Sequence, residues 1–329
     1  MEMELLNHNE TDLFDEQAIE QIVSTEKPFI QANTIASSLE EIKSKHVIPV
    51  FVKDNEPVIS HSDFIECTLE VAASIYTSET ILKPSVRLSH PIKGRVPEAK
   101  LKSAAELLEH ERTLYYERMA FIIEVPTVYD EIDGSVLSLT IGGVKAYNLD
   151  NLYNKKGADE HFKLFIGFKN SVCTNLCVST DGYISDLKVR NIGQLKACIR
   201  TLIDNYNLNY HIHSLRKFNE YSVTEQQFAH LIGRCRMYTH LPTEEKNELS
   251  PLMLSDTQLG AVVKDFYKDN SFCRDAEGNI NLWKLYNLFT GANKSSYIDT
   301  FLNRSVSAFS FVECLKRTLD ERETNWFLN

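Results

Sequence analysis

Apolar residues alternate along several short segments between residues 121 and 189, and beyond Ile192 they recur every three or four residues. Alternation is the pattern of a strand that buries one face, whereas the longer period is that of a helix. Every second residue from Phe162 to Phe168 is apolar, which shows the first pattern clearly. The change of period constrains the chain to an α+β fold, with an antiparallel sheet followed by a mostly helical half.

Turn signals divide the alternating part into about five strands. Asp133-Gly134 is a hairpin signature, and Asp181-Gly182 is a second turn of the same composition. Short connections of this kind join antiparallel neighbours, so a β-meander is predicted. The expected strands are residues 121–125, 136–141, 162–168, 171–178 and 183–189, with a turn at Lys169-Asn170.

Capping signals mark the helices. Thr224 with Gln227 and Ser255 with Gln258 have the spacing of a capping box, as do Ser103 and Glu106. The expected helices are residues 62–76, about a dozen residues from Ser103, residues 192–206, one helix after each later box, residues 281–289 ending at Gly291, and a long last helix capped by Ser295 or Ser296.

Three regions follow from these patterns. Residues 1–45 form an acidic arm that we expect to be flexible or helical, and residues 46–191 form the sheet region, which begins with a short strand at 47–52. Residues 192–329 form a helical region packed on the sheet. The basic stretch between Lys83 and Lys102 contains three prolines and a glycine, so we expect it to be extended and irregular.

Charge is unevenly distributed along the chain. The formal net charge is −11, of which the first 45 residues contribute −7 through ten acidic and three basic residues. The stretch from Lys83 to Lys102 carries +5. An acidic whole disfavours tight nonspecific binding to nucleic acid but is compatible with a local basic track. The alternative is that both segments are simply solvated.

Residues able to contact phosphates, sugars and bases gather in three segments. The first is the basic stretch, the second is the amide-rich and tyrosine-rich segment 147–157, and the third is the joint near residue 294. Amide groups in such segments also cap local turns, which is the competing explanation. The candidate nucleic-acid or anion-binding residues are Lys83, Arg87, His90, Lys93, Arg95, Asn148, Asn151, Lys155, Lys156, Lys294, Ser296 and Arg304.

Several familiar site patterns fail on inspection. Residues 291–296 resemble a phosphate loop, but Asn293 stands where the second glycine of that loop belongs, so a joint between two helices is favoured. Cys173 and Cys177 lie in an apolar strand at an unusual spacing for zinc, so we predict neither a metal nor a cofactor. Asp181 and Asp186 are the candidate acids of a Mg²⁺-dependent hydrolase, although turn chemistry also explains Asp181.

Five long strings carry a resemblance to a known family. They are residues 46–65, 87–99, 139–157, 161–183 and 279–306, which include HFKLFIGFKNSVCTNLCVSTDGY and NINLWKLYNLFTGANKSSYIDTFLNRSV. The chain resembles a Bacteroidetes mobile-element family, domain of unknown function 3871. Residues 172–175 and 282–287 resemble, more weakly, a broader phage- and plasmid-borne family. The resemblance implies a setting among replication, recombination and antirestriction functions, and it supplies no catalytic residues.

We therefore expect a cytoplasmic, non-enzymatic protein that binds nucleic acid, by preference single-stranded. Seven scattered cysteines, an acidic N-terminus and no apolar run of about 20 residues agree with a reduced compartment and no membrane partner. Two alternatives remain open. One is a module that binds a host or element-encoded protein, for example a host defence enzyme that it inhibits, and the other is the Mg²⁺-dependent hydrolase.

Overall fold

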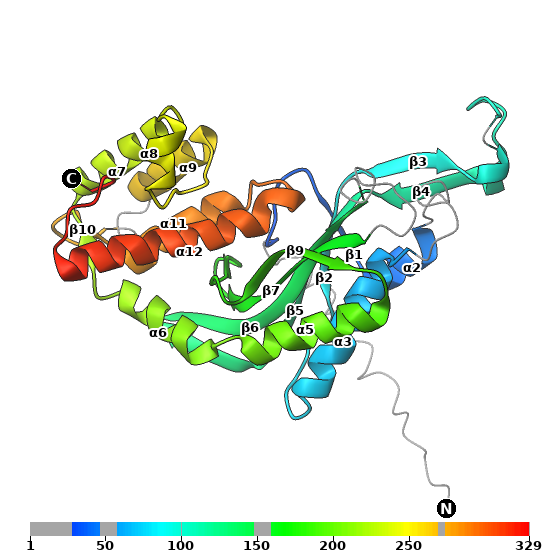
Figure 1. Ribbon diagram of the computed structural model, residues 1–329, viewed down its shortest axis with the longest axis horizontal. Helices are drawn as coiled ribbons and strands as arrows, with labels where there is room; N and C mark the ends of the chain where they lie inside the picture. The colour runs from blue at the N-terminus through cyan, green and yellow to red at the C-terminus, as the bar shows by residue number, and fades with distance from the viewer. Residues whose placement is uncertain (1–27, 47–57, 100, 148–158, 269–273, 329) are drawn as a thin grey trace, which may run out of the picture.

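The computed structural model describes residues 28–46, 58–99, 101–147, 159–268 and 274–328, and its centre is a curled antiparallel sheet (Figure 1). The strands follow the order β1-β2-β5-β6-β7, and β8 and β9 both pair with β7. The bounds are β1 Ile35–Ser37, β2 Ser85–Leu88, β5 Arg118–Ile132, β6 Ser135–Ala146, β7 Glu160–Asn170, β8 Leu176–Cys177 and β9 Tyr183–Val189.

The predicted meander is confirmed at its centre. Strands β5, β6 and β7 are consecutive antiparallel neighbours, and Asp133 and Gly134 join the first two with φ angles of 50° and 71°. Two positive φ angles are those of the two-residue turn that matches strand twist. The predicted turn at Lys169-Asn170 is wrong, because β7 continues through both residues. Of the predicted strand 171–178, only the two residues of β8 form a strand. The turn between β7 and β8 is held by the Asn170 side chain.

Four strands, β1 to β4, come from segments for which no strand was expected. Ile35–Ser37 lies within the predicted acidic arm but pairs with β2, and Phe29 and Ile30 are buried. The basic stretch is extended as predicted but not irregular, since it forms β2 and then β3 (Pro91–Arg95), which pairs with β4 (Arg112–Tyr116). The expected strand 47–52 lies outside the described residues.

The helix predicted from Ser103 is wrong. The Ser103 amide does donate to the Glu106 carboxylate over 3.0 Å, as in a capping box. However, the chain there forms turns, and the short 3₁₀ helix η3 (Glu109–Glu111) leads into β4. Lys102 pairs with Glu111 across this segment and closes it into a loop. A cap satisfies an amide in a turn as well as in a helix, so the signal alone does not establish a helix.

The remaining described residues are mostly helical, and both later capping boxes are confirmed. A two-residue sheet joins β10 (Ser222–Val223) to β11 (Ile280–Asn281), and η2 (Pro97–Ala99) is a second 3₁₀ helix. The helices are α2 Leu39–Lys45, α3 His61–Ile75, α5 Ile192–Asn205, α6 Leu208–Phe218, α7 Glu225–Tyr238, α8 Thr243–Asn247, α9 Asp256–Lys268, α11 Leu282–Asn293 and α12 Ile298–Glu321.

The joint between α11 and α12 differs in detail from the prediction. Gly291 lies inside α11, which continues to Asn293. The N-cap of α12 is Tyr297, whose side chain makes no capping bond, instead of a serine. Ser296 instead donates to the side chain of Asn293 over 2.6 Å. The amide of Asn293 in turn donates to the carbonyl of Phe301, which ties the two helices together.

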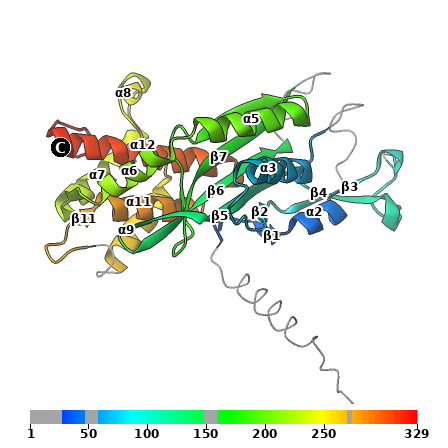
Figure 2. The same cartoon turned by 90° about the horizontal axis from the view of Figure 1, so that it is seen from below.

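The sheet has two buried faces covered by different helices (Figure 2). On one face, alternate residues such as Phe121 and Leu164 pack with α3 and α5 in the main core. On the other face, Ile122 and Phe165 pack with Phe301 at the start of α12. Burial on both sides explains why β6 is apolar almost throughout. Among the described residues, no helix combines the length and apolarity needed to cross a lipid bilayer.

Gly143 on β6 lets α3 approach the sheet closely. A Cβ at this position would lie 2.5 Å from the carbonyl oxygen of Lys163 and 2.5 Å from the ring of Phe64 on α3. Neither neighbour is a flexible end, because one is backbone and the other is a buried ring with rings packed against two of its sides. A side chain here would push the helix off the sheet.

A buried polar group, which we call the Lys145 cluster, lies where β6 and β7 meet the segment before α3. The Lys145 ammonium contacts the Glu160 carboxylate at 2.7 Å, and both side chains are almost fully buried. The same carboxylate accepts the backbone amide of Ile59 at 3.0 and 3.1 Å. The cluster also includes His46 and His61, whose rings lie 4.9 Å apart.

Tyr147 and backbone groups complete the Lys145 cluster. The hydroxyl of Tyr147 accepts the amide of His61 at 3.2 Å, and the His61 ring stacks on the tyrosine ring at 4.4 Å. Burial lowers the pKa of His46 to about 4. Burial, followed by repulsion from His46, holds the pKa of His61 well below its ordinary value. Both imidazoles are therefore neutral at physiological pH.

Candidate nucleic-acid interface

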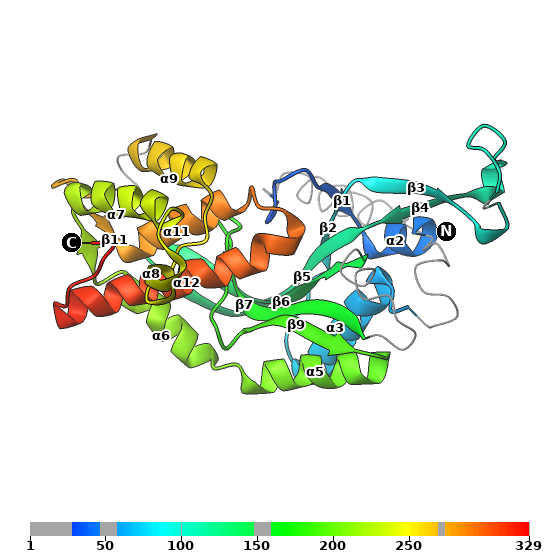
Figure 3. The ribbon, with the colours of Figure 1, turned by 45° about the horizontal axis from the view of Figure 1, so that its top comes forward.

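Strands β3 and β4 form a two-stranded ribbon that projects away from the rest of the molecule (Figure 3). Five residues of each strand are paired, from Pro91 opposite Tyr116 to Arg95 opposite Arg112. The ribbon starts directly after β2 and ends just before β5, so both of its strands run into the central sheet. A projecting β-ribbon has a cross-section that the major groove of B-DNA can admit.

One face of the ribbon carries three cations. Paired residues lie on the same side of a ribbon and successive residues alternate, so Lys93, Arg95 and Arg112 share one face. Arg95 donates to the backbone carbonyl of Lys102, and Arg112 donates to that of Leu107 at 3.3 Å. Within the described part of the chain, none of the three forms an ion pair with an acid. The face is therefore a positive strip whose charges lack counter-ions in the described structure.

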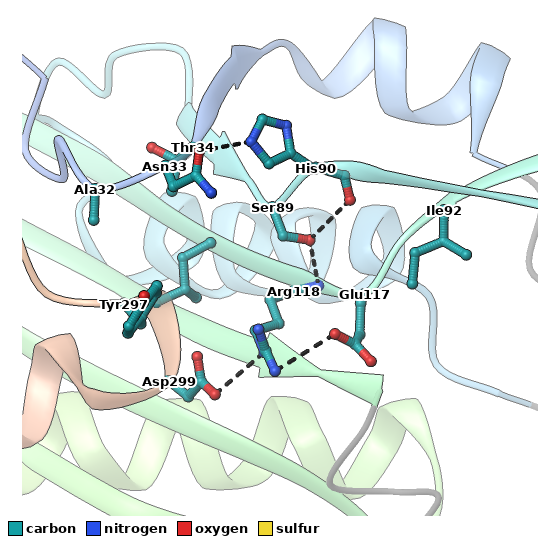
Figure 4. A pocket seen from close by; sticks show the side chains of 11 residues that line it. Ala32, Asn33, Thr34, Ser89, His90, Ile92, Glu117, Arg118, Tyr297 and Asp299 are labelled. Carbon is teal, nitrogen blue, oxygen red and sulfur yellow. Dashed lines mark hydrogen bonds and ion pairs between the residues drawn. The ribbon is translucent and has the colours of Figure 1, made fainter.

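A groove of about 190 Å³ lies at the base of the ribbon (Figure 4). It opens between the segment before β1, the turn from β2 to β3, and the start of α12. Arg118 at the start of β5 lies between two acids in this groove, 3.5 Å from Glu117 and 3.2 Å from Asp299. The ring of Tyr297 borders the groove and is 68% exposed.

Three of the predicted binding residues lie around this groove or next to β2. His90 lines the groove, and its Nε2 lies 2.6 Å from the amide oxygen of Asn33. Arg87 on β2 donates to the hydroxyl and the carbonyl of Thr34, so it fastens the segment that leads into β1. Lys83 is exposed in the loop before β2, where its charge acts on Glu40. Of these, His90 alone lines the groove.

The predicted residues at the joint between α11 and α12 are used inside the protein. Lys294 is 5% exposed, and its ammonium donates to the carbonyl of Cys173 and, at 2.7 Å, to the hydroxyl of Thr174. Ser296 is buried, and Arg304 donates to its hydroxyl at 2.9 Å. Lys294 joins the helical half to the turn before β8, whereas Ser296 and Arg304 bond within the helical half, and the structure does not bring the three together with the ribbon.

The remaining predicted residues lie outside the described part of the chain. Asn148, Asn151, Lys155 and Lys156 all fall between residues 148 and 158. The ribbon cations Lys93 and Arg95 were predicted, but Arg112 was missed, because its place opposite Arg95 depends on a pairing across 16 intervening residues. Arg118 and Tyr297 were also missed. No local pattern marks them, and the groove exists only once β5 meets the start of α12.

The candidate hydrolase acids do not share a site. Asp181 accepts bonds from the hydroxyl of Ser179 at 2.6 Å and the amide of Asn207 at 3.0 Å, as expected of a turn residue. Asp186 lies 2.7 Å from His161, and this hydrogen bond lowers the pKa of the carboxyl. Among the described residues there is no group of three or more His, Cys, Asp or Glu side chains that could hold a metal.

Neither the two cysteines considered as zinc ligands nor the histidines His211 and His213 form a metal site among the described residues. Burial raises the pKa of Cys177 far above its ordinary value and lowers that of His211 to about 3. The His211 ring hydrogen-bonds to the hydroxyl of Tyr206 over 2.6 Å, whereas His213 is exposed. All six cysteines in the described part of the chain are free thiols. Cys177 and His211 are buried core components, as expected of a cysteine among apolar residues.

The fold and its projecting ribbon define an α+β protein built on a curled sheet, and comparison with known proteins gives its family. The chain belongs to the family described as "Domain of unknown function, B. Theta Gene description (DUF3871)", whose model matches residues 10–328. No curated protein and no solved structure matches the chain. The family description agrees with a Bacteroidetes origin.

Proposed function

We propose that this protein binds nucleic acid non-enzymatically through the β3–β4 ribbon, with a preference for single strands. The observation that carries the proposal is the strip formed by Lys93, Arg95 and Arg112. Cations without acid partners interact with phosphates without first having to break an ion pair. Release of condensed counter-ions then supplies much of the binding free energy. Net negative charge elsewhere keeps the binding local to the ribbon.

Placement of the strip on a ribbon supports the proposal further. Arg95 and Arg112 lie directly opposite each other, and like charges in this position destabilise a strand pair. A polyanion relieves this repulsion when it binds. The proposed binding surface is smaller than the sequence suggested. Arg87 and Lys294, two of the other predicted cations, bond to groups within the fold.

The test is a salt-dependent titration of wild-type protein with single-stranded and duplex DNA, followed by mobility shift. Replacing Lys93, Arg95 and Arg112 by alanine should weaken binding and lower the slope of log affinity against log salt by about 0.7 for each lost phosphate contact. A triple alanine variant of Lys264, Lys268 and Arg317, which are exposed cations on α9 and α12, should leave both quantities unchanged. Absence of wild-type binding even at low salt would overturn the proposal.

The far end of the ribbon supports the alternative of a protein-binding module that inhibits a host defence enzyme. Leu101 is 97% exposed and Leu108 is 55% exposed, beside the exposed acids Glu106 and Glu109. Exposed apolar side chains surrounded by charge are typical of protein contact sites. Under this alternative, a Leu101→Asp/Leu108→Asp variant loses a stoichiometric partner recovered from host lysate by the wild type, and DNA binding is absent in both.

We also propose that the protein is cytoplasmic and encoded by a mobile genetic element. The free thiols support a reducing compartment, in which cysteines persist unpaired. The strings that resemble the phage- and plasmid-borne family support the genomic setting. Fractionation of the native host, together with the location of its gene relative to conjugation or phage genes, tests both points.

A further inference from the structure

The groove at the base of the ribbon has two walls that suit a flat ring. Tyr297 presents an exposed ring on one side, and within the described part of the chain its hydroxyl makes no hydrogen bond. Ile92 presents a partly exposed apolar side chain on another side, with Arg118 between the two (Figure 4). A volume of about 190 Å³ is below the range of pockets that enclose drug-sized ligands. The space suits a single ring system.

The floor of the groove carries an acceptor, Oδ1 of Asp299, which is buried and has no hydrogen-bond partner in the described structure. The other oxygen of this carboxylate, Oδ2, forms an ion pair with Nε of Arg118 at 3.2 Å. A buried polar atom without a partner is costly, so a ligand that donates a hydrogen bond to Oδ1 is favoured. A nucleobase edge presents an acceptor beside a donor.

Charge in the groove favours a base over a phosphate. Glu117 and Asp299 place two carboxylates around the single guanidinium of Arg118. A phosphate would meet this net negative charge, whereas a neutral base would not. An N–H group of a base would also bond well to a carboxylate, which only accepts hydrogen bonds. The groove adjoins the base of the ribbon, because Ile92 lines it, and Lys93 is the next residue, on the opposite face of the same strand.

We propose that this groove holds one unpaired nucleobase, stacked on Tyr297 with its Watson–Crick edge toward Arg118 and Asp299. The inference rests on the proposed function, because the ribbon is what holds the backbone of the same strand. It adds the reason for a single-strand preference. A base in a duplex has its Watson–Crick edge occupied and its faces stacked, so it does not enter the groove.

The experiment uses the full chain and a single-stranded oligonucleotide of about 16 nucleotides that contains 2-aminopurine. Wild-type protein should quench the fluorescence by stacking, and Tyr297→Ala should abolish the quenching and weaken binding about tenfold. Tyr297→Phe should retain both, because it keeps the ring. Tyr129→Ala is the matched control, since Tyr129 is 65% exposed on β5, and it should behave as wild type.

The outcomes separate this inference from the proposed function. If Tyr297→Ala binds and quenches like wild type while the ribbon variant loses affinity, the ribbon binds nucleic acid and the base site is wrong. If Tyr297→Ala weakens binding to single strands and to duplex equally, the tyrosine is a general contact and the base site is again wrong. If wild-type protein binds no oligonucleotide, both proposals fail. Thermal unfolding of each variant confirms that the fold is retained.

Discussion

The ribbon exposes a lysine to solvent, whereas the Lys145 cluster buries one and pairs it with an acid. Lys145 is fully buried and held by Glu160 at 2.7 Å, with its ammonium 4.0 Å from the centre of the Phe162 ring. Lys93 is exposed on the ribbon, where no acid in the described structure pairs with it. A buried charge must be neutralised locally, whereas an exposed one is solvated by water and small ions. The first lysine therefore affects the free energy of unfolding, and the second is available for a ligand.

Glu160→Gln should give the largest effect on the comparison. It removes the negative charge that contacts the buried Lys145 ammonium, and the loss of one partner of a buried ion pair costs about 3–5 kcal/mol of unfolding free energy. Urea denaturation followed by circular dichroism measures the loss. Glu41→Gln is the control, because Glu41 forms an exposed pair with Lys45 at 2.8 Å, and it should leave the midpoint unchanged. Equal midpoints for wild type and Glu160→Gln would contradict the structural role of the pair.

Gly143→Ala should have the next largest effect, because the new Cβ would overlap the Lys163 carbonyl and the Phe64 ring. Overpacking of this kind costs about 1–3 kcal/mol. Gly233→Ala on α7 is a matched control with nothing within 4 Å of the new Cβ, and helix propensity predicts a gain of about 1 kcal/mol. Opposite shifts in the unfolding midpoint are expected. A stabilising Gly143→Ala would show that α3 does not rest on the sheet at this point.

Lowering the pH should destabilise the protein gradually through the Lys145 cluster. Because the folded protein holds the pKa of His46 near 4, below the ordinary 6.5, the unfolded chain takes up protons that the folded chain does not. The contribution of neutral His46 to the free energy of unfolding is therefore fully present above about pH 6.5, and it is lost as the pH drops toward 4. His46→Gln should flatten this part of a plot of unfolding free energy against pH. A slope unchanged by the substitution would remove His46 as its source.

The smallest effect on folding should come from the ribbon. Replacing Lys93, Arg95 and Arg112 by alanine removes no ion pair seen in the described structure. It removes two side-chain hydrogen bonds to backbone carbonyls but also the repulsion between Arg95 and Arg112, so the thermal midpoint should change little while affinity for DNA falls. If the variant loses stability and affinity together, the ribbon cations contribute to the free energy of unfolding, as Lys145 does. Differential scanning fluorimetry beside the binding titration distinguishes the two results.

The central strands and most helices could be predicted because their signals are local. Alternation from Phe162 to Phe168 indicated one face of β7, and all four apolar residues are in the main core. The capping box at Thr224 indicated the start of α7, and the reciprocal bonds are present. These elements have long patterns or reciprocal contacts within a few residues, so neighbouring sequence is sufficient.

The elements and site residues that were missed depend on distant partners. β1 is three residues long and exists because it pairs with β2 some 50 residues later. Ser103 and Glu106 make their predicted bond, but the return of the chain to β4 prevents a helix. Similarly, Arg112 and Tyr297 become candidate site residues only through the pairing of β3 with β4 and the approach of α12 to β5.

The two outer edges of the ribbon have a consequence for solubility. Its strands pair only with each other among the described residues, so a row of backbone amides and carbonyls along each edge has no neighbouring strand. Bare edges invite pairing with another copy of the chain, and charged side chains on the edge prevent it. The ribbon cations Lys93, Arg95 and Arg112 therefore oppose edge-to-edge aggregation, and they do so even without a bound polyanion.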